Sequence, residues 1–193
     1  MNDSNRKVSS ESEELILVDS NDQEVGHLSK AHCHDGAGIL HRAFSLFLFN
    51  DSGELLLQQR AESKRLWPGY WSNSCCSHPR RGESMEIATM RRLSDELNIE
   101  TELEHVYRFC YSAEFGEAGS ENELCHVYLG RVNGRVQPNE SEISGVRFVS
   151  AGNLAQELAN DAERFTPWFK QEWRDLTENY GEALSKYCGD LNS

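Results

Sequence analysis

Three histidines and two glutamates stand where they could bind a divalent metal ion. His34 and His41 flank a loop rich in glycine and histidine, and His78 lies in a second, longer loop. Glu121 and Glu123 are two residues apart, so in an extended segment both side chains point to the same face. Imidazole and carboxylate groups together suit Mn²⁺, Zn²⁺ or Mg²⁺. The alternative is a chance scatter of common residue types.

A pair of cysteines, Cys75 and Cys76, precedes His78 in the long loop, which also contains Trp67-Pro68-Gly69 and Trp71. A cysteine two residues from a possible metal ligand is placed where its pKa could be lowered. The alternative is a buried pair of small apolar side chains.

A third feature is the pair Arg92 and Glu96, one turn apart in a predicted helix. The ordinary interpretation is a surface ion pair worth a few tenths of a kcal/mol. The more specific interpretation is that the Glu96 carboxylate holds Mg²⁺ for a diphosphate, with Arg92 beside it.

The distribution of charge favours a pocket for a small anion. The whole chain has a net charge of −13, which argues against a nucleic-acid partner because phosphate contacts need a basic surface. The segment from Arg60 to Arg92, however, contains seven lysines and arginines but only three acidic residues. The alternative to an anion pocket is a solvated basic face.

The elements that must position these residues are several strands, a helix between them and further helices after them. Apolar runs predict strands at 15–19, 43–50, 54–60, 105–115, 124–132 and 145–149. A polar turn covers 20–24, and Asp51-Ser52-Gly53 joins the second and third strands into a hairpin. The segments 30–40 and 61–83 are predicted to be loops, and a loop as long as the second is usually functional.

Helices are predicted at 84–97, 154–160 and 168–180. In the first, Ser84 is the expected N-cap and Glu86 lies in the favourable first turn. Its predicted inner face consists of Ile87, Met90, Leu93 and Leu97. Asn98 is expected to end it in the left-handed conformation. Strands with helices between and after them indicate an α+β layered domain.

The 193 residues fit one domain, predicted to span 15–193. Residues 1–14 are almost without apolar side chains, which predicts a disordered tail. We find no signal-peptide or membrane-spanning pattern, so we expect a soluble, cytoplasmic protein. The six cysteines show no CxxC pair, which favours free thiols over a disulfide framework.

Residues 77–99 resemble a degenerate Nudix box, Ser77-x5-Glu83-x7-Arg91-Arg92-Leu93-x-Asp95-Glu96-x-Asn98-Ile99. Ser77 and Asn98 occupy the usual glycine positions, and Arg92 replaces the first glutamate of the hydrolase core. This replacement puts ordinary Nudix hydrolase activity in doubt.

Over roughly residues 15–175 the chain is similar to type I isopentenyl-diphosphate delta-isomerases. The blocks that carry the resemblance are LHRAFSLFLFN, RAESKRLWPGYWSNSCCSHP, RRLSDEL, SENELCHVY and FTPW. The resemblance implies a Nudix-like α/β/α sandwich with a mixed sheet. It also implies isomerisation of isopentenyl diphosphate to dimethylallyl diphosphate through a carbocation.

The resemblance further assigns roles to individual residues. Cys76 and Glu123 form the acid/base pair, Tyr111 is hydrogen-bonded nearby, and Cys75 is structural. One divalent ion, Mn²⁺, Mg²⁺ or Zn²⁺, is held by His34, His41, His78, Glu121 and Glu123. A second ion, Mg²⁺, is held by Glu96 and bridges to the diphosphate. The substrate-binding positions are Lys30, Arg60, Lys64, Ser77, Arg92 and Trp168.

Two other functions stay open at this point. A Nudix-type diphosphate hydrolase would release phosphate, and an inactive relative would only bind its ligand. The hydrolase would act on a nucleotide or a prenyl diphosphate, and the expected partner of the chain is a small prenyl diphosphate substrate. We expect no nucleic-acid partner and no membrane insertion, and a monomer or weak homodimer.

Overall fold

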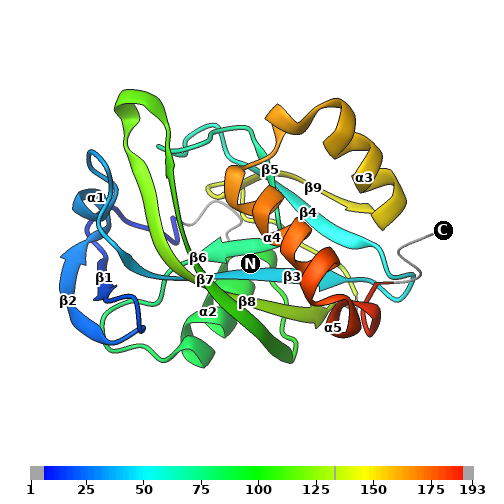
Figure 1. The fold of residues 1–193 in the computed structure, drawn as a ribbon, viewed down its shortest axis with the longest axis horizontal. Helices are drawn as coiled ribbons and strands as arrows, with labels where there is room; N and C mark the ends of the chain where they lie inside the picture. The colour runs from blue at the N-terminus through cyan, green and yellow to red at the C-terminus, as the bar shows by residue number, and fades with distance from the viewer. Residues whose placement is uncertain (1–6, 133, 189–193) are drawn as a thin grey trace.

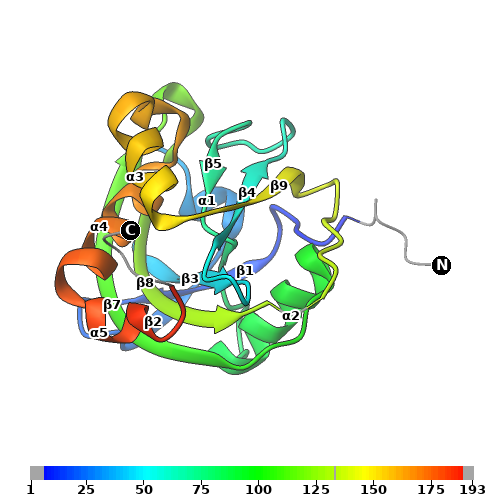
Figure 2. The ribbon, with the colours of Figure 1, turned by 90° about the vertical axis from the view of Figure 1, so that its right-hand side faces the viewer.

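The computed structural model describes residues 7–132 and 134–188. A nine-stranded mixed sheet forms the middle layer of the molecule (Figure 1). Helix α2 (Met85–Leu97) covers one face, while α3 (Ala151–Asn160), α4 (Pro167–Asn179) and α5 (Gly181–Ser185) lie on the other (Figure 2). The predicted α+β fold, a layered α/β/α sandwich with a mixed sheet, is confirmed.

The strands are β1 (Glu14–Val18), β2 (Glu24–Ser29), β3 (His41–Phe49), β4 (Leu55–Arg60), β5 (Trp71–Ser72), β6 (Cys75–Ser77), β7 (Leu103–Glu114), β8 (Ser120–Arg131) and β9 (Ile143–Val149). Short helices complete the fold: α1 (Lys30–Cys33) and the 3₁₀ turns η1 (Gly116–Ala118) and η2 (Ala162–Arg164). The sequence predicted neither β2 nor α5, and it placed α1, β5 and β6 inside loops. These elements are two to six residues long, too short for a hydrophobic period to emerge.

Strand β3 is the centre of the sheet and sets the register of the site. It runs parallel to β8, with His41 opposite Glu123. On its other side it runs antiparallel to β6, with Ser45 opposite Cys76. The predicted hairpin of β3 and β4 pairs only at Phe49 and Leu55, after which β4 pairs with β5 and β9.

Both faces of β3 are buried, which explains its almost unbroken apolar sequence. Phe44, Leu46 and Leu48 pack in the core on the α2 side, whereas Phe47 and Phe49 pack in the core on the α4 side. Central strands of this kind hold the site residues on a rigid support.

Helix α2 begins and ends as predicted but presents a different face to the core. The Ser84 hydroxyl accepts a hydrogen bond from the Ile87 backbone N–H, and Asn98 is left-handed with φ of 55°. Leu93 and Leu97 are buried, but Ile87 and Met90 are 57% and 55% exposed. That part of the prediction is wrong, because the buried stripe of α2 includes the charged Arg92 and Glu96. A prediction from apolar periodicity places such charged residues on the exposed face of the helix.

The N-terminal segment differs from the predicted tail. Residues 1–6 lie outside the described part, but Val8 is buried and β1 already begins at Glu14. The carbonyl oxygen of Val8 accepts a hydrogen bond from Arg92. The Lys30 backbone N–H donates to the carbonyl of Glu13. Residues 7–14 therefore contact the rest of the chain through hydrogen bonds as well as through the buried side chain of Val8.

Among the described residues, no helix combines the length and the apolar character that crossing a membrane requires.

Candidate active site

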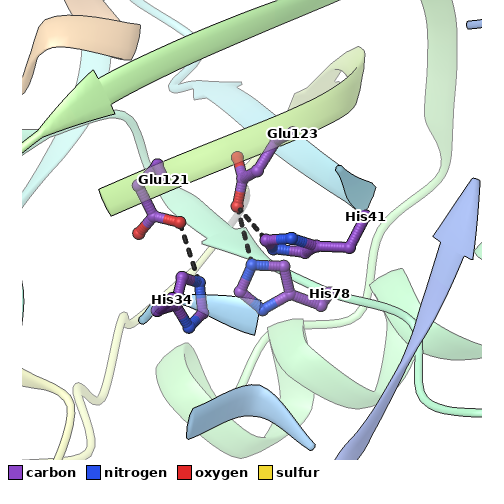
Figure 3. Close-up of side chains that lie close together, drawn as sticks. All are labelled: His34, His41, His78, Glu121 and Glu123. Carbon is purple, nitrogen blue, oxygen red and sulfur yellow. Dashed lines mark hydrogen bonds and ion pairs between the residues drawn. The ribbon is translucent and has the colours of Figure 1, made fainter. Parts of the chain in front are cut away.

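Five side chains predicted to bind a metal ion converge on one point (Figure 3). His34 follows α1, His41 opens β3, His78 follows β6, and Glu121 and Glu123 lie on β8. One ligand atom from each lies within 4.8 Å of all the others. The two glutamates share a face of β8, as their spacing predicts.

Backbone carbonyls orient two of the histidines so that their other ring nitrogens face the centre. Nδ1 of His34 lies 2.8 Å from the Lys30 carbonyl oxygen, and Nδ1 of His41 lies 2.7 Å from that of Ile39. A carbonyl only accepts, so each Nδ1 carries the proton and donates it. Each Nε2 is therefore free to offer its lone pair to a metal ion.

The same atoms are left without hydrogen-bond partners in the described structure. Nε2 of His34 lies 2.8 Å from Oε2 of Glu121, yet neither atom has a hydrogen bond. Nε2 of His41, 3.6 Å from Oε1 of Glu123, is also unpartnered. Buried acceptors that face one another in this way are stabilised by a cation between them, so the donor set fits a divalent metal ion.

The pKa values of His78 and of the two glutamates suit metal binding. Burial and the neighbouring imidazoles hold the pKa of His78 well below its usual value, so its ring is neutral as a ligand must be. Burial would raise the pKa of Glu121, but His34 outweighs it and the pKa is lowered. Burial would likewise raise the pKa of Glu123, yet the nearby His41 ring and the hydrogen bond from Tyr111 lower it. Both carboxylates are therefore ionised.

The two adjacent cysteines face opposite sides of the sheet. Cys75 is fully buried on the α2 side, where its thiol donates to Glu96 at 3.5 Å. Cys76 lines a pocket on the other side, 3.8 Å from Nη1 of Arg60. Burial raises the pKa of Cys76 to about 12, although Arg60 opposes the shift, so the protein at rest carries the thiol.

Glu123 also borders this pocket and is joined there by Tyr111. The two residues are direct partners across β7 and β8, and the Tyr111 hydroxyl donates a short hydrogen bond to Oε2 of Glu123. Burial raises the pKa of Tyr111 well above its usual value, so the phenol keeps its proton.

Trp168 and Tyr111 give the pocket an aromatic wall, and further rings pack behind Trp168. Trp168 lies edge-on to Trp67, with ring centroids 5.2 Å apart, and Trp67 is 5.0 Å from Phe115. The guanidinium of Arg60 lies 5.2 Å from the centre of the Trp168 ring. The family resemblance implied Trp168 as a pocket residue, whereas the supporting rings of Trp67 and Phe115 were not predicted.

The predicted substrate-binding residues Lys30, Arg60, Lys64, Ser77 and Arg92 line the same pocket, and its four cations form what we call the cationic end. Burial and the charge of Lys64 lower the pKa of Lys30, a sign of cations crowded together. The Lys30 ammonium donates to the Ser9 hydroxyl at 2.7 Å and lies 3.8 Å from the Glu11 carboxylate.

Arg92 and Glu96 form a buried ion pair, so their interpretation as a surface pair is wrong. Both side chains are only 3% exposed. Nε of Arg92 donates to Oε1 of Glu96 at 2.7 Å, and the guanidinium also reaches Glu142 at 3.2 Å. Glu96 therefore lies directly behind a cation of the pocket, but it does not belong to the histidine cluster.

The sequence analysis did not identify two buried carboxyl groups near the pocket. Glu142 pairs with Lys64 and Arg92. Glu172 on α4 accepts a hydrogen bond from the Cys125 thiol at 3.5 Å. No sequence signal marks Glu142, which follows a polar loop, but Glu172 is four residues after Trp168 and therefore shares its helix face.

Comparison with known proteins agrees with these observations. The NUDIX domain family matches residues 39–169. Isopentenyl-diphosphate Delta-isomerase 1 of Photorhabdus laumondii is 42% identical over 89% of this chain and 99% of its own. The isopentenyl-diphosphate Delta-isomerase of Serratia proteamaculans is 42% identical over 90% and 97%.

Solved structures are similar as well. The Deinococcus radiodurans protein DR0079 has a TM-score of 0.63 at 25% identity, over 77% of this chain and 90% of its own. The MutT protein of Methanosarcina mazei has a TM-score of 0.58 at 20% identity, over 75% and 94%. The second likeness concerns the fold alone.

Proposed function

The chain belongs to the isopentenyl-diphosphate Delta-isomerases of the NUDIX-domain family, and from this premise we propose how its pocket converts isopentenyl diphosphate into dimethylallyl diphosphate. The reaction adds one proton to the terminal alkene carbon and removes another from the carbon two positions away. It therefore needs an acid and a base on either side of a short hydrocarbon chain.

One observation carries the assignment: Cys76 and Glu123 line one narrow pocket from strands on opposite sides of β3. Cys76 is opposite Ser45, and Glu123 is opposite His41. A flat five-carbon chain lying between them would meet one group on each face.

The resting protonation states favour one order of the two transfers. Cys76 holds a proton and Glu123 does not. Cys76 therefore gives its proton to the terminal carbon, and Glu123 takes a proton from the other carbon. Tyr111, held to Glu123, steers that acceptor. The sequence alone leaves this order open. One proton exchange with solvent after each turnover restores the enzyme.

The aromatic wall suits the cationic intermediate. A desolvated tryptophan face stabilises positive charge by about 2 kcal/mol. Trp168 is only 2% exposed and borders the same pocket as both catalytic groups. Its indole also excludes water, which would otherwise trap the cation.

The metal ions and the cations hold the two ends of the reaction in place. The five-ligand cluster would hold one divalent ion, which fixes Glu123, and a second ion, Mg²⁺, would neutralise diphosphate charge near Glu96. Lys30, Arg60, Lys64 and Arg92 would bind the diphosphate itself. Binding energy from that end is remote from the reacting carbons and positions them.

Proton NMR in deuterated water, beside phosphorus NMR of the same sample, tests the function. We expect deuterium to enter the product and the diphosphate to stay intact. If inorganic phosphate or isopentenyl monophosphate accumulates faster than dimethylallyl diphosphate, the chain is a hydrolase. Arg92 argues against that outcome, because a guanidinium can neither bind Mg²⁺ nor accept a proton.

The cytoplasmic location and the monomeric or weakly dimeric state stay predictions. Cell fractionation and analytical ultracentrifugation of the full chain would check them.

A further inference from the structure

Glu142 lies behind the cationic end of the pocket and contacts two of its cations. Its side chain is 4% exposed. One carboxylate oxygen, Oε2, forms a short ion pair with the Lys64 ammonium and lies 3.2 Å from Nη2 of Arg92. Lys64 comes from the loop after β4 and Arg92 from α2, so a single carboxylate joins two separate elements.

The backbone of Glu142 is fixed as firmly as its side chain. Its carbonyl accepts a hydrogen bond from the Ala61 backbone N–H at 2.9 Å, and its own N–H donates to the Asn139 carbonyl at 3.0 Å. Ala61 precedes Lys64 by three residues, so Glu142 holds both ends of the turn that carries the lysine. The carboxylate is therefore a preset part of the site.

In the substrate-free protein, the Glu142 carboxylate is ionised and lies between two cations. Burial alone would raise the pKa of Glu142, but Lys64 and Arg92 outweigh it and lower the pKa, so the group is ionised. Two cations this close together in a buried site repel each other strongly unless an anion lies between them. Without Glu142, Lys64 would turn away toward solvent.

We propose that Glu142 is a positioning residue that holds Lys64 and Arg92 in the geometry that receives the diphosphate. The inference rests on the proposed function, since it concerns binding of the same substrate. Glu142 touches no reacting atom; it acts through the two cations.

The charges next to the diphosphate-binding cations support this role. Three carboxylates, Glu11, Glu96 and Glu142, lie among or directly behind the cations Lys30, Arg60, Lys64 and Arg92. They offset part of the positive charge, which suits a diphosphate whose own charge Mg²⁺ has partly neutralised.

The experiment compares Glu142→Gln with Glu140→Gln, the same change at an exposed position of the same loop. For each protein we would measure kcat and KM for isopentenyl diphosphate, and the inhibition constant of inorganic diphosphate with Mg²⁺. E142Q should raise KM and the inhibition constant together by at least about tenfold, with kcat within about threefold, because a buried ion pair loses one partner. E140Q should match the wild type.

A second background checks that Glu142 acts through Lys64. In Lys64→Met, adding E142Q should weaken diphosphate binding by less than it does in the wild type, because one of the two partners of Glu142 is already gone and only Arg92 remains. Full additivity would overturn the proposal, as would a KM that is unchanged or lower in E142Q.

A second variant and a separate test of the wild type make the experiment decisive. If E142Q does not fold, Glu142→Asp, which withdraws the carboxylate by one methylene, should still weaken diphosphate binding severalfold, and unchanged binding would overturn the proposal. If the wild type binds inorganic diphosphate but does not isomerise the substrate, the proposed function fails while the inference about Glu142 remains measurable.

Discussion

At the scale of single residues, strand alternation separates the roles of two neighbouring cysteines. Cys75 points to the α2 side, where its thiol meets Glu96, and Cys76 points into the pocket. The side chains of consecutive strand residues always face opposite sides. Only one of the two thiols can therefore reach substrate.

We expect Cys76→Ala to lower kcat by about 10²–10⁴-fold, the usual contribution of a general acid or base. Cys75→Ala should keep most of the activity and cost about 1 kcal/mol of unfolding free energy, because it removes a small buried side chain. Product formation followed by proton NMR, beside urea unfolding of both variants, checks this. Equal losses of kcat would mean that Cys75 also reaches the pocket.

Residue roles divide into those that the sequence could predict and those that it could not. The spacing of Glu121 and Glu123 on a strand fixes their common direction, so the cluster was partly predictable. Glu142 was not, because its partners Lys64 and Arg92 are 78 and 50 residues away in sequence. Contacts over such distances follow from the packing of whole elements.

At the scale of elements, the metal cluster depends on a contact between the α1 loop and the tip of the β7–β8 hairpin (Figure 1). The Ser120 N–H donates to the His34 carbonyl at 3.0 Å, and the Ser120 hydroxyl donates to the Gly36 carbonyl at 2.7 Å. Arg65 joins the same two segments by donating to the carbonyls of Ala31 and Ala118. These bonds position His34.

Gly119 is the point of closest approach in that contact. Its φ is +130°, and a Cβ there would overlap the carbonyl oxygen of His34. Gly119→Ala should therefore displace His34 and weaken Mn²⁺ binding by about tenfold or more, in the range typical of lost support for a metal ligand. Isothermal titration calorimetry of the metal-free protein with Mn²⁺ measures this affinity.

Gly116→Ala is the matched control, because Gly116 also has a positive φ, of +56°, but a Cβ added there would meet no atom within 4 Å. It should cost about 1–2 kcal/mol of stability and leave Mn²⁺ affinity unchanged. If both variants bind Mn²⁺ like the wild type, the hairpin contact does not position His34.

The same scale shows where pattern recognition ends. The long strands and three longer helices follow from their hydrophobic periods, and the caps of α2 follow from Ser84 and Asn98. The orientation of α2 about its axis does not follow from them. Arg92 and Glu96 face the protein interior, whereas Ile87 and Met90, which were predicted to face it, are exposed. Polar residues buried for function carry no apolar signal.

At the scale of the whole molecule, one buried acid links stability to pH. Glu172 is fully buried between α4 and the sheet, and its Oε2 has no hydrogen-bond partner among the described residues. No described cation pairs with it. Burial raises the pKa of Glu172 to about 8, so at neutral pH the folded protein holds this carboxyl in its neutral form.

The sign of the effect on stability follows from proton counting. The unfolded chain releases the Glu172 proton near its ordinary pKa of about 4.3, whereas the folded chain keeps it until about pH 8. Between these values the folded state binds more protons, so the contribution of Glu172 to stability falls as pH rises. It is fully present below the lower value and levels off above the upper one.

Glu172→Gln removes the ionisable group and keeps nearly the same shape. The unfolding free energy of this variant relative to the wild type should therefore rise between pH 5 and pH 8 by up to about 1.4 kcal/mol per pH unit, and then level off. Urea unfolding at intervals of one pH unit measures the difference. Glu178→Gln, on an exposed position of the same helix, should show a difference that stays constant with pH. A constant difference for E172Q as well would mean that Glu172 is ionised in the folded protein, and a cation or water must then lie at its unpartnered oxygen.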